Sequence, residues 1–529
     1  MKKYFTFWTI LSIIGICLLF VVLQWNSFNA PFERDEGHYA YGAWLLTQGH
    51  VPYVDTFEQK PPLIFFPYLL AVLINSAAFW PVHLIAFISF ALTVGLLGLT
   101  VTREFGQRAG LIAMWLITPM VMLPYLTPFA ANTEKFMILP LMGLLAIYVF
   151  NRDKPGNWPW FFAAVCGAAT ILYKQIAIFA VLFIFLVWLV ENWRREKSVG
   201  SLLPRILFAL AGAVLTFVLV TGYFFARGGW PGFWEQTVEF NRYYMAASGG
   251  LTFNFLFNHL KIFLYYWQAL FFLLIWFLIK RPLRWGFYLG LLLISLASIF
   301  NTPYGHYYIM LMPFWAIVSA VALDSLIDQI AIRFKPAMKG WVTFALVFLV
   351  LLSMLWPVRS WYFMTPTEVT SRSYSLLNPF VEAPIVAQRV ADLTKPDDYV
   401  FVAGTEQEIL YYAKRLGPTR FGGMYGLMIE HPKALAYQQE LVAELGKHPP
   451  KVIVWVRSPL SWLVRRSSPR LIFQYLDKLL KERYELVGGS IRRGDSAYWQ
   501  EPLKKETYGS CSIKVYKLKA RYFSPTKNP

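Results

Sequence analysis

Long apolar runs, separated by short clusters of Lys and Arg, recur along the first two thirds of this chain. A helix that crosses a bilayer needs roughly 20 apolar residues, so each run is a candidate membrane span. Once one further candidate is set aside, about eleven runs remain, at residues 5–25, 81–101, 110–126, 136–150, 160–174, 175–190, 204–225, 259–279, 285–300, 306–323 and 340–357. This pattern predicts a mainly α-helical, polytopic membrane bundle.

The composition excludes a soluble globular protein and a disordered chain. The 529 residues are 57% hydrophobic and only 15% charged, and the mean hydropathy is +0.45. The net charge of +19 first suggests nucleic acid. However, most basic residues of the first 357 positions lie in the short connections, where they indicate membrane topology. We therefore expect membrane lipids around the chain and no nucleic-acid partner.

The basic clusters also orient the chain. With Lys2 and Lys3 inside, every second connection is cytoplasmic, and each of these carries Lys or Arg. Those residues are Arg103 and Arg108; Arg152 and Lys154; Arg194, Arg195, Lys197 and Arg205; Lys280, Arg281 and Arg284; and Arg333, Lys335 and Lys339. The first run is too long for a typical cleaved signal and is interpreted as a signal anchor. We predict a multi-pass protein with a cytoplasmic N-terminus.

The segment set aside, residues 61–80, is apolar enough to span the membrane. A span here would place Arg103 and Arg108 outside and would invert every later connection. We therefore place it as an interfacial helix on the outer face, where its proline pair and Asn75 are tolerated. The alternative is a true span and a total of twelve helices, and hydropathy alone does not separate the two.

The sequence changes character after residue 357. Short β-like runs, DYVFVAG and KVIVWV, alternate with helical runs, ALAYQQELVAEL and LIFQYLDKLLKERYEL. We expect a transmembrane domain over residues 1–357 and a small α/β domain over residues 358–529. Because the number of spans is odd, this second domain is extracytoplasmic. Its excess of Lys and Arg fits either attraction to anionic lipid or glycan, or a solvated basic surface.

Polar side chains gather in the outer connections, although charged groups near bilayer depth are costly and are usually kept for a purpose. They come from separate connections that open on the same side: Glu33, Arg34, Asp35, Glu36, His38, Asp55, Glu58 and Lys60; Asn132, Thr133, Glu134 and Lys135; Lys174 and Gln175; Arg227, Glu235, Glu239, Asn241, Arg242, Tyr243 and Tyr244; and Tyr304, His306 and Tyr307. This one-sided gathering predicts a site at the outer membrane face.

Carboxylates and cations on one membrane face suit a transfer reaction with a charged leaving group. A carboxylate takes a proton from an acceptor hydroxyl or amine, while cations hold a departing phosphate. Glycosyl transfer from a polyprenyl-phosphate-linked sugar needs both. Lys60 leads directly into the predicted interfacial helix, so it is the first candidate for the phosphate contact, with Lys174 and His306 as further candidates.

Four stretches resemble a known family. RDEGHYAYGAWLLTQGHVPYVDTFEQKPPL closely resembles the first outer loop of the C-type polyprenyl-phosphate-dependent glycosyltransferases, which include protein O-mannosyltransferases and the lipid A aminoarabinose transferase. ANTEKFMILP, YKQIAIFA and PYGHYYIMLMP follow in the order expected for the bacterial branch. The resemblance covers about residues 1–357. It implies a first outer loop with two interfacial helices, which supports the placement of residues 61–80.

The resemblance implies roles for individual residues. Asp35 would be the base that activates the acceptor, with Glu36 beside it in the catalytic cavity, and Lys60 would hold the donor phosphate. Glu134 matches the acidic position of the second outer loop, although the aminoarabinose transferase has an aspartate there in a different local setting. The predicted substrate-binding residues are Glu58, Asn132, Glu134 and Tyr304. No cofactor is required, because the family includes members that work without metal; a divalent metal is compatible with the resemblance but not implied by it.

The residues of the first outer loop also have ordinary structural explanations. Asp35 or Glu36 would cap the helix that begins there, since acids are favoured at a helix N-terminus. Lys60 would extend to lipid headgroups, as a lysine beside a span often does. A metal site at His38 and Glu36 is weakly indicated, because no second histidine lies near them in the sequence.

Similar explanations apply to the later connections. Glu134 would pair with Lys135 at the end of a span, and Lys174 would mark the outer end of another. His306 fits an aromatic belt at the membrane interface, and the same belt or simple packing accounts for the tyrosines at positions 243 and 244.

The sequence thus predicts a glycosyltransferase of the bacterial inner membrane. It would move a hexose or pentose from a polyprenyl-phosphate donor to an envelope lipid, glycan or protein on the outer face. We expect inversion at the anomeric carbon, with Asp35 and Lys60 on opposite sides of the sugar. Two other classes are a transporter or flippase of a lipid-linked anionic substrate and a non-catalytic envelope assembly protein. A transporter should carry polar groups through its spans and on both faces, which this sequence does not.

Overall fold

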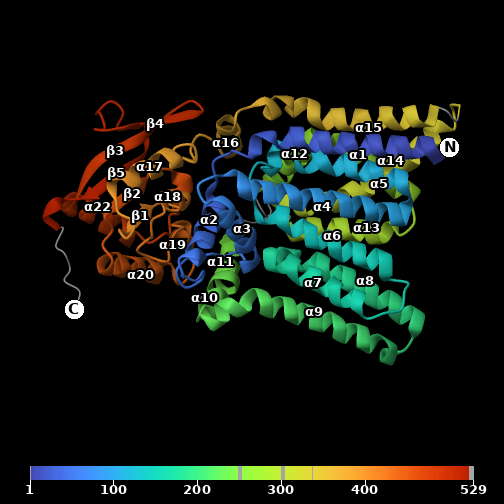
Figure 1. The fold of residues 1–529 in the computed structure, drawn as a ribbon, viewed down its shortest axis with the longest axis horizontal. Helices are drawn as coiled ribbons and strands as arrows, with labels where there is room; N and C mark the ends of the chain where they lie inside the picture. The colour runs from blue at the N-terminus through green and yellow to red at the C-terminus, as the bar shows by residue number, and fades with distance from the viewer. Residues whose placement is uncertain (1, 248–252, 300–303, 336–337, 523–529) are drawn as a thin grey trace.

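The structure is an elongated helical bundle with an α/β region at one end (Figure 1). The computed structural model describes residues 2–247, 253–299, 304–335 and 338–522. Within this part of the chain, the helices that run along the bundle are α1 (Lys2–Gln24), α4 (Trp80–Phe105), α5 (Gln107–Val121), α6 (Thr133–Asn151), α7 (Trp158–Tyr173), α8 (Ile178–Glu196), α9 (Val199–Ala226), α12 (Phe253–Lys280), α13 (Trp285–Ile299), α14 (Met312–Ala331) and α15 (Lys339–Leu355).

Eight helices in the described residues are long and apolar enough to cross a membrane by length and composition. Three shorter bundle helices, α5, α7 and α13, have 15 or 16 residues and pack against the longer ones. Each predicted span corresponds to one bundle helix, so the predicted polytopic helical bundle is confirmed. Residue 300, which ends one predicted span, and residues 523–529 of the predicted second domain lie outside the described residues.

The two ends of the bundle differ in character. The N-terminus lies at the end away from the α/β region (Figure 1). Ion pairs between basic connections and neighbouring helices lie at this end, including Arg152 Nη2 to Glu104 Oε2 at 2.9 Å and Arg195 Nη1 to Asp153 Oδ1 at 3.2 Å. The start of the chain and the α/β region are therefore at opposite ends, as an odd number of crossings requires.

Short helices form the other end of the bundle, beside the α/β region. They are α2 (Arg34–Thr47), α3 (Phe65–Asn75), the 3-10 helix η4 (Gln175–Ala177), α10 (Trp230–Trp234), the π-helix η5 (Glu235–Glu239), α11 (Phe240–Ala247) and the 3-10 helix η6 (Gly305–Met310). Helix α3 has 11 residues, which is about 16 Å of helix against a hydrocarbon thickness of about 30 Å. The short length favours the interfacial placement of residues 61–80, which stays a prediction, because α7 and α13 are also shorter than a full span.

The α/β region contains a five-stranded sheet in the order β1-β2-β5-β3-β4. Only β1 and β2 pair in parallel. The strands are β1 (Val400–Ala403), β2 (Val452–Val456), β3 (Tyr484–Arg493), β4 (Ser496–Gln500) and β5 (Cys511–Leu518). The helices are α16 (Pro366–Tyr374), α17 (Ala383–Leu393), α18 (Glu408–Ala413), α19 (Tyr425–Met428), α20 (Ala434–Lys447), α21 (Pro459–Trp462) and α22 (Leu471–Arg483). The predicted runs contain β1, β2, α20 and α22, but the last one turns into β3 at Tyr484.

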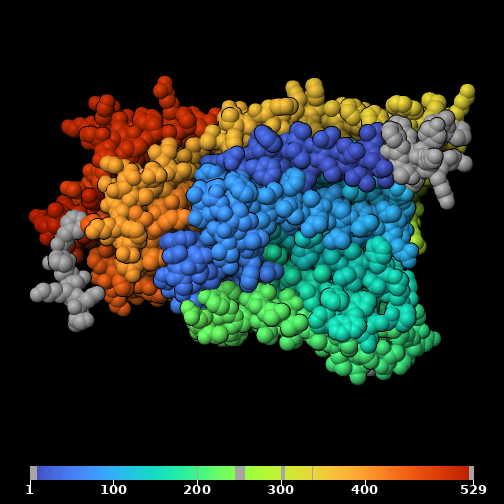
Figure 2. Space-filling model, in the orientation of Figure 1, coloured from blue at the N-terminus to red at the C-terminus, as the bar shows by residue number. Residues whose placement is uncertain are grey.

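The α/β region is packed onto the first outer loop. One hydrophobic core joins Tyr39 of α2 to Val402 of β1 and to other strand residues. Gly37 of α2 lies so close to α18 that an added Cβ would be 2.8 Å from the backbone nitrogen of Glu408. In Figure 2, the orange atoms of the C-terminal part lie directly against blue atoms of the N-terminal part. The two parts therefore share one interior.

Candidate active site

The first turn of α2 is closed by a capping box that does not use Asp35. The side chain of Glu33 accepts a hydrogen bond from the backbone N–H of Glu36 at 3.3 Å, and the Glu36 side chain accepts one from the Glu33 N–H at 3.1 Å. This exchange satisfies backbone donors that a helix start otherwise leaves unpaired. Glu33 is thus the cap, and the Asp35 carboxylate is left for another contact.

Asp35 faces Lys60. The two are joined by an ion pair with Lys60 Nζ 3.9 Å from Asp35 Oδ2; the Asp35 side chain is 35% exposed and that of Lys60 only 8%. Burial alone would raise the pKa of Asp35, but the charges of Lys60 and His306 hold this pKa below its usual value. Asp35 is therefore an ionised carboxylate that solvent reaches at neutral pH, which is the state that a general base requires.

The chain around Lys60 is fixed by three hydrogen bonds. The Tyr53 hydroxyl donates to the Lys60 carbonyl at 2.7 Å, the Lys60 N–H donates to Glu58 Oε1 at 2.9 Å, and the Glu58 N–H donates to Gln236 Oε1 at 2.8 Å. Burial disfavours the ammonium, but Tyr39 and then Asp35 keep the pKa of Lys60 well above its usual value. Lys60 is therefore a buried cation in a fixed position.

Glu58 and His38 are buried neighbours of the ion pair between Asp35 and Lys60. His38 Nδ1 is 3.8 Å from Glu58 Oε2, and both side chains are buried. Burial raises the pKa of Glu58 to about 7 and lowers the pKa of His38 to about 4. His38 is therefore uncharged at neutral pH, whereas Glu58 is near the midpoint of its titration.

Tyr39 belongs to this group although the sequence analysis did not single it out. Its side chain is 1% exposed, and its hydroxyl has no hydrogen-bond partner within the described residues. Tyr39 follows Asp35 by four positions, so both lie on the same face of α2. That spacing is the signal that would have found it.

Glu36 points away from Asp35 and Lys60. Its Oε1 accepts a hydrogen bond from the Ala131 N–H at 2.7 Å and lies 2.8 Å from His83 Nε2. The buried carboxylate thus joins the start of α2 to α4 and to the loop before α6. These contacts favour a positioning role, and the catalytic role implied by the resemblance stays a prediction.

A second polar group lies where α6, the turn between α7 and α8, and η6 meet. The Lys174 ammonium pairs with Glu134 and lies 3.2 Å from the centroid of the Tyr307 ring. His306 Nε2 is 3.9 Å from the same Glu134 oxygen. Glu134 therefore pairs with Lys174 and not with Lys135, whose ammonium donates to a backbone carbonyl.

The two groups share one electrostatic environment. The positive charge of Lys174, and that of His306 when this ring is protonated, both contribute to the lowered pKa of Asp35. Burial lowers the pKa of His306, so this ring carries a charge less readily than an exposed histidine. Of the three predicted phosphate-binding residues, Lys60 is thus the one that stays positively charged beside Asp35. The charge of Lys174 is balanced by its ion pair with Glu134.

The remaining predicted residues lie at the edge of these groups. Asn132 is the N-cap residue of α6, and its buried Oδ1 has no hydrogen-bond partner in the described part of the chain. Tyr304 is 40% exposed and stacks on His306, with ring centroids 5.8 Å apart. Among the residues that the structure describes, no group of three or more His, Cys, Asp or Glu side chains is arranged to hold a metal ion.

Comparisons with known proteins identify the fold. The family described as dolichyl-phosphate-mannose-protein mannosyltransferase matches residues 59–223. ArnT from Cupriavidus metallidurans, bound to undecaprenyl phosphate, superposes with a TM-score of 0.58 at 14% identity, over 96% of this chain and 98% of that one. The archaeal oligosaccharyltransferase AglB from Archaeoglobus fulgidus gives a TM-score of 0.54 at 13% identity, over 98% and 89%. The chain has the C-type glycosyltransferase fold.

The C-type fold agrees with the resemblance that the sequence motifs indicate. The family model covers residues 59–223 of the stretch over which that resemblance runs. The curated proteins contain no significant sequence match to this chain. The stretch matched by the family includes Lys60, Asn132, Glu134 and Lys174, whereas Asp35 precedes it. The family match therefore does not include Asp35, and the role proposed for it rests on its contacts in this structure.

Proposed function

We propose that this protein is a membrane glycosyltransferase that moves a hexose or pentose from a polyprenyl-phosphate-linked donor to an envelope lipid, glycan or protein. One observation carries the proposal: an accessible, ionised Asp35 faces the buried ammonium of Lys60 where the chain enters the short helix α3. The ArnT structure is bound to undecaprenyl phosphate, and the AglB structure is in complex with a dolichol-phosphate and an inhibitory peptide. Both support a polyprenyl phosphate as the carrier.

In the proposed reaction, Asp35 is the general base and Lys60 holds the leaving group. The acceptor oxygen or nitrogen forms a bond to the anomeric carbon, and its proton passes to the Asp35 carboxylate. The bond between that carbon and the phosphate oxygen breaks, and its electron pair leaves with the polyprenyl phosphate. The Lys60 ammonium stabilises the charge that develops on this phosphate. Attack opposite the phosphate inverts the anomeric configuration. This geometry requires the sugar to enter between Asp35 and Lys60, so their 3.9 Å ion pair has to open when the donor binds.

The neighbouring residues keep this pair in place. Glu36 fixes the first turn of α2, and Glu58 fixes the backbone at Lys60. Glu134, with its paired Lys174, borders the substrate on the other side. No resident cofactor is required in this proposal, because Lys60 supplies positive charge at the phosphate; a divalent metal is compatible with it.

The proposed location is a bacterial cytoplasmic membrane, with the N-terminus inside and the site on the outer face. The basic connections support this orientation, because they lie at the end of the bundle opposite the site. The α/β region then lies outside the cytoplasm, beside the acceptor.

An Asp35→Asn variant tests the proposed base. Asparagine keeps the shape of the side chain but does not accept the proton, so we expect transfer from a radiolabelled polyprenyl-phosphate sugar to fall by about 10²- to 10⁴-fold. The product is counted in the envelope fraction, and gel filtration in detergent checks the fold. Asp397→Asn, at an exposed aspartate of the α/β region, is the matched control and should keep full activity.

Two results would contradict the proposal. Full transfer by a well-folded Asp35→Asn variant would remove Asp35 from its role, and a product with retained anomeric configuration would remove the inverting mechanism. A transporter would instead move the labelled lipid across a vesicle membrane, with no sugar transferred by either form.

A further inference from the structure

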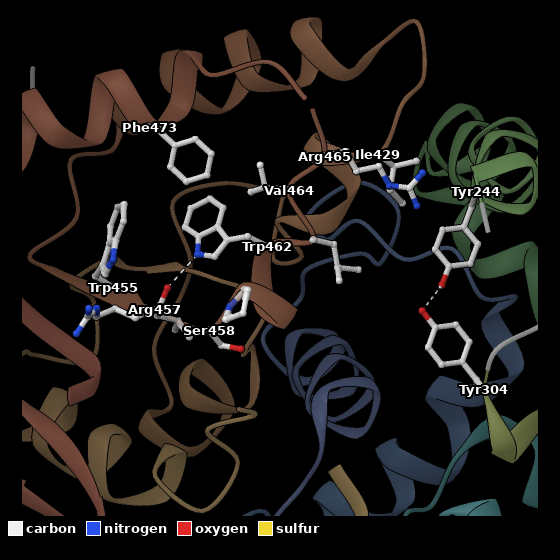
Figure 3. Close-up of a pocket in the computed structure, with 13 residues that line it drawn as sticks. Tyr244, Tyr304, Ile429, Trp455, Arg457, Ser458, Trp462, Val464, Arg465 and Phe473 are labelled. Atoms are coloured by element: carbon white, nitrogen blue, oxygen red, sulfur yellow. Dashed lines mark hydrogen bonds between the residues drawn. The ribbon is translucent and has the colours of Figure 1, made fainter. Parts of the chain in front are cut away.

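A cavity of about 670 Å³ opens between the α/β region and the outer connections of the bundle (Figure 3). Its walls come from the end of β2 and the following segment, from α21 and α22, and, on the bundle side, from Tyr244 of α11 and from Tyr304. The volume lies in the range of small-molecule binding sites, about 300–1,000 Å³. We call this cavity the aromatic pocket.

Three aromatic rings form the far wall of the aromatic pocket. The Trp462 ring centroid lies 5.7 Å from that of Trp455 and 4.7 Å from that of Phe473. The Trp462 indole N–H donates to the Val456 carbonyl at 2.9 Å, as the dashed line in Figure 3 shows. The polar atom of this ring is therefore satisfied within the protein, and the ring, which is 5% exposed, supports the partly exposed Trp455. The flat face of Trp455 suits contact with the C–H face of a sugar ring.

The charge of the aromatic pocket is entirely positive within the described residues. Arg457 and Arg465 line it, and no Asp or Glu does. Arg457 is held in place because its Nη1 donates to three backbone carbonyls, with distances between 2.9 and 3.2 Å. A fixed guanidinium binds phosphate or carboxylate oxygens with good geometry. The pocket thus combines stacking surfaces with recognition of an anion.

Two chains of aromatic contacts connect the aromatic pocket to the candidate active site. Tyr304 stacks on His306, which borders Glu134. On the other side, the Tyr244 ring lies 6.4 Å from Tyr425, whose ring lies 6.5 Å from His38. The Tyr244 and Tyr304 hydroxyls also meet at 3.4 Å, where the two chains begin (Figure 3). The pocket is therefore linked to the groups around Asp35 through these rings, although none of those groups lines it.

The sheet beside the pocket does not offer the commonest way to bind a peptide. A peptide often adds a strand to the free edge of a sheet. Strand β2, which forms the pocket wall, is paired with β1 on one side and with β5 on the other. The pocket therefore favours a carbohydrate over an extended peptide.

We propose that the aromatic pocket binds the acceptor, and that this acceptor is a carbohydrate with a phosphate or carboxylate group. Trp455 stacks on a sugar ring, supported from behind by the buried Trp462, and the anionic group binds Arg457 or Arg465, which lie at opposite ends of the pocket (Figure 3). This inference rests on the proposed function, and it narrows the acceptor from any envelope lipid, glycan or protein to an anionic glycan.

Binding to the full-length protein in nanodiscs tests the proposal without a known acceptor. The probes are a maltotetraose 6-phosphate, neutral maltotetraose and hexaglutamate, measured by isothermal titration calorimetry. We expect the phosphorylated sugar to bind about tenfold or more tightly than the neutral one, because of its charge-assisted hydrogen bonds. Equal binding of the two sugars, or tighter binding of hexaglutamate, would overturn the proposal.

Variants assign the effect to the pocket. Arg457→Gln and Arg465→Gln should reduce the preference for the phosphorylated sugar. Trp455→Ala should weaken the binding of both sugars, whereas Trp455→Phe should keep it. Arg466→Gln is the matched control, because Arg466 is exposed beside Arg465 but does not line the pocket. An unchanged preference in folded Arg457→Gln and Arg465→Gln would exclude the pocket as the binding site.

Transfer kinetics separate this inference from the proposed function. With an envelope glycan fraction as acceptor, Trp455→Ala should raise the acceptor KM about tenfold and leave kcat and the donor KM unchanged. An unchanged acceptor KM in an active enzyme would overturn the pocket inference alone. If the wild type transferred no sugar, the proposed function would fail, and the binding comparison would still decide what the pocket holds.

Discussion

At the scale of residues, the candidate site is a set of charges that fix one another's ionisation. Asp35 stays ionised because Lys60 is close, and Lys60 stays charged partly because Asp35 is close. The dense acids of the first loop and the lysine before a proline pair are visible in the sequence. The partners of Glu36 and Glu134 are not, because His83 and Lys174 lie 47 and 40 positions further along the chain. No local spacing indicates such pairs.

Lys60 should determine the affinity for the donor. In Lys60→Gln, the phosphate loses a charge-assisted contact, so we expect the donor KM to rise about 10- to 100-fold. Lys60→Arg keeps the charge and should recover part of the affinity. Initial rates against the concentration of polyprenyl-phosphate sugar give the KM, with the exposed Lys154→Gln as the control. An unchanged donor KM in a folded Lys60→Gln variant would argue against the phosphate contact.

Glu58 should make stability decrease as the pH rises through neutrality. Its pKa is about 7 in the folded protein, above the ordinary value of 4.5. Between these values the folded state binds more protons than the unfolded chain, so stability is lost as the pH rises. Glu58→Gln does not titrate, and its Tm relative to the wild type should therefore increase from pH 5 to pH 8. Thermal unfolding in detergent measures this difference.

A control variant and a contradicting result are defined for the Glu58 prediction. Glu430→Gln, at an exposed glutamate, should differ from the wild type by the same amount at every pH. If the difference between Glu58→Gln and the wild type were equally flat, the carboxyl of Glu58 would not titrate near neutrality.

At the scale of elements, α2 is the part on which the site depends. Its first turn is closed by the capping box, one face carries Asp35 and Tyr39, and Gly37 contacts α18. The sequence predicts the bundle helices well, because long apolar runs have few alternatives. Through the charges of distant connections, it also predicts an interfacial placement for α3. Strands β3 to β5 were not foreseen, because their sequences mix glycine, charge and apolar residues without clear alternation.

Gly37→Ala should weaken the contact between α2 and α18. The added methyl group would meet the backbone nitrogen of Glu408 at 2.8 Å, so the two helices have to separate. We expect a loss of about 1–3 kcal/mol in the free energy of unfolding, with lower transfer activity. Gly446→Ala is the control, because this helical glycine has open space around its Cα and alanine there favours α20. A wild-type Tm for Gly37→Ala would contradict the close approach.

At the scale of the whole molecule, the basic connections and the candidate site lie at opposite ends of the bundle. Basic connections with their ion pairs form one end, and the candidate site with the α/β region forms the other (Figure 1). Hydropathy and charge together predict this division. They do not predict how tightly the α/β region packs on the bundle, because the residues of that interface are ordinary core residues in each part.

Cysteine labelling tests the orientation. In a variant with Cys17, Cys166 and Cys511 replaced by Ser, Arg466→Cys should react with a membrane-impermeant maleimide in intact spheroplasts. Arg194→Cys, on a basic connection, should react only after permeabilisation. The reverse pattern would place the site inside the cytoplasm.

The interior shared by α2 and the sheet has a consequence for how such enzymes diversify. Because Tyr39 packs in the same core as Val402, the C-terminal part is not an exchangeable module. A chimera that takes this part from a relative must also take the first outer loop, or it breaks the packing that orients Asp35. Changes of acceptor preference are thus expected to co-evolve with the helix that carries Asp35, the proposed base.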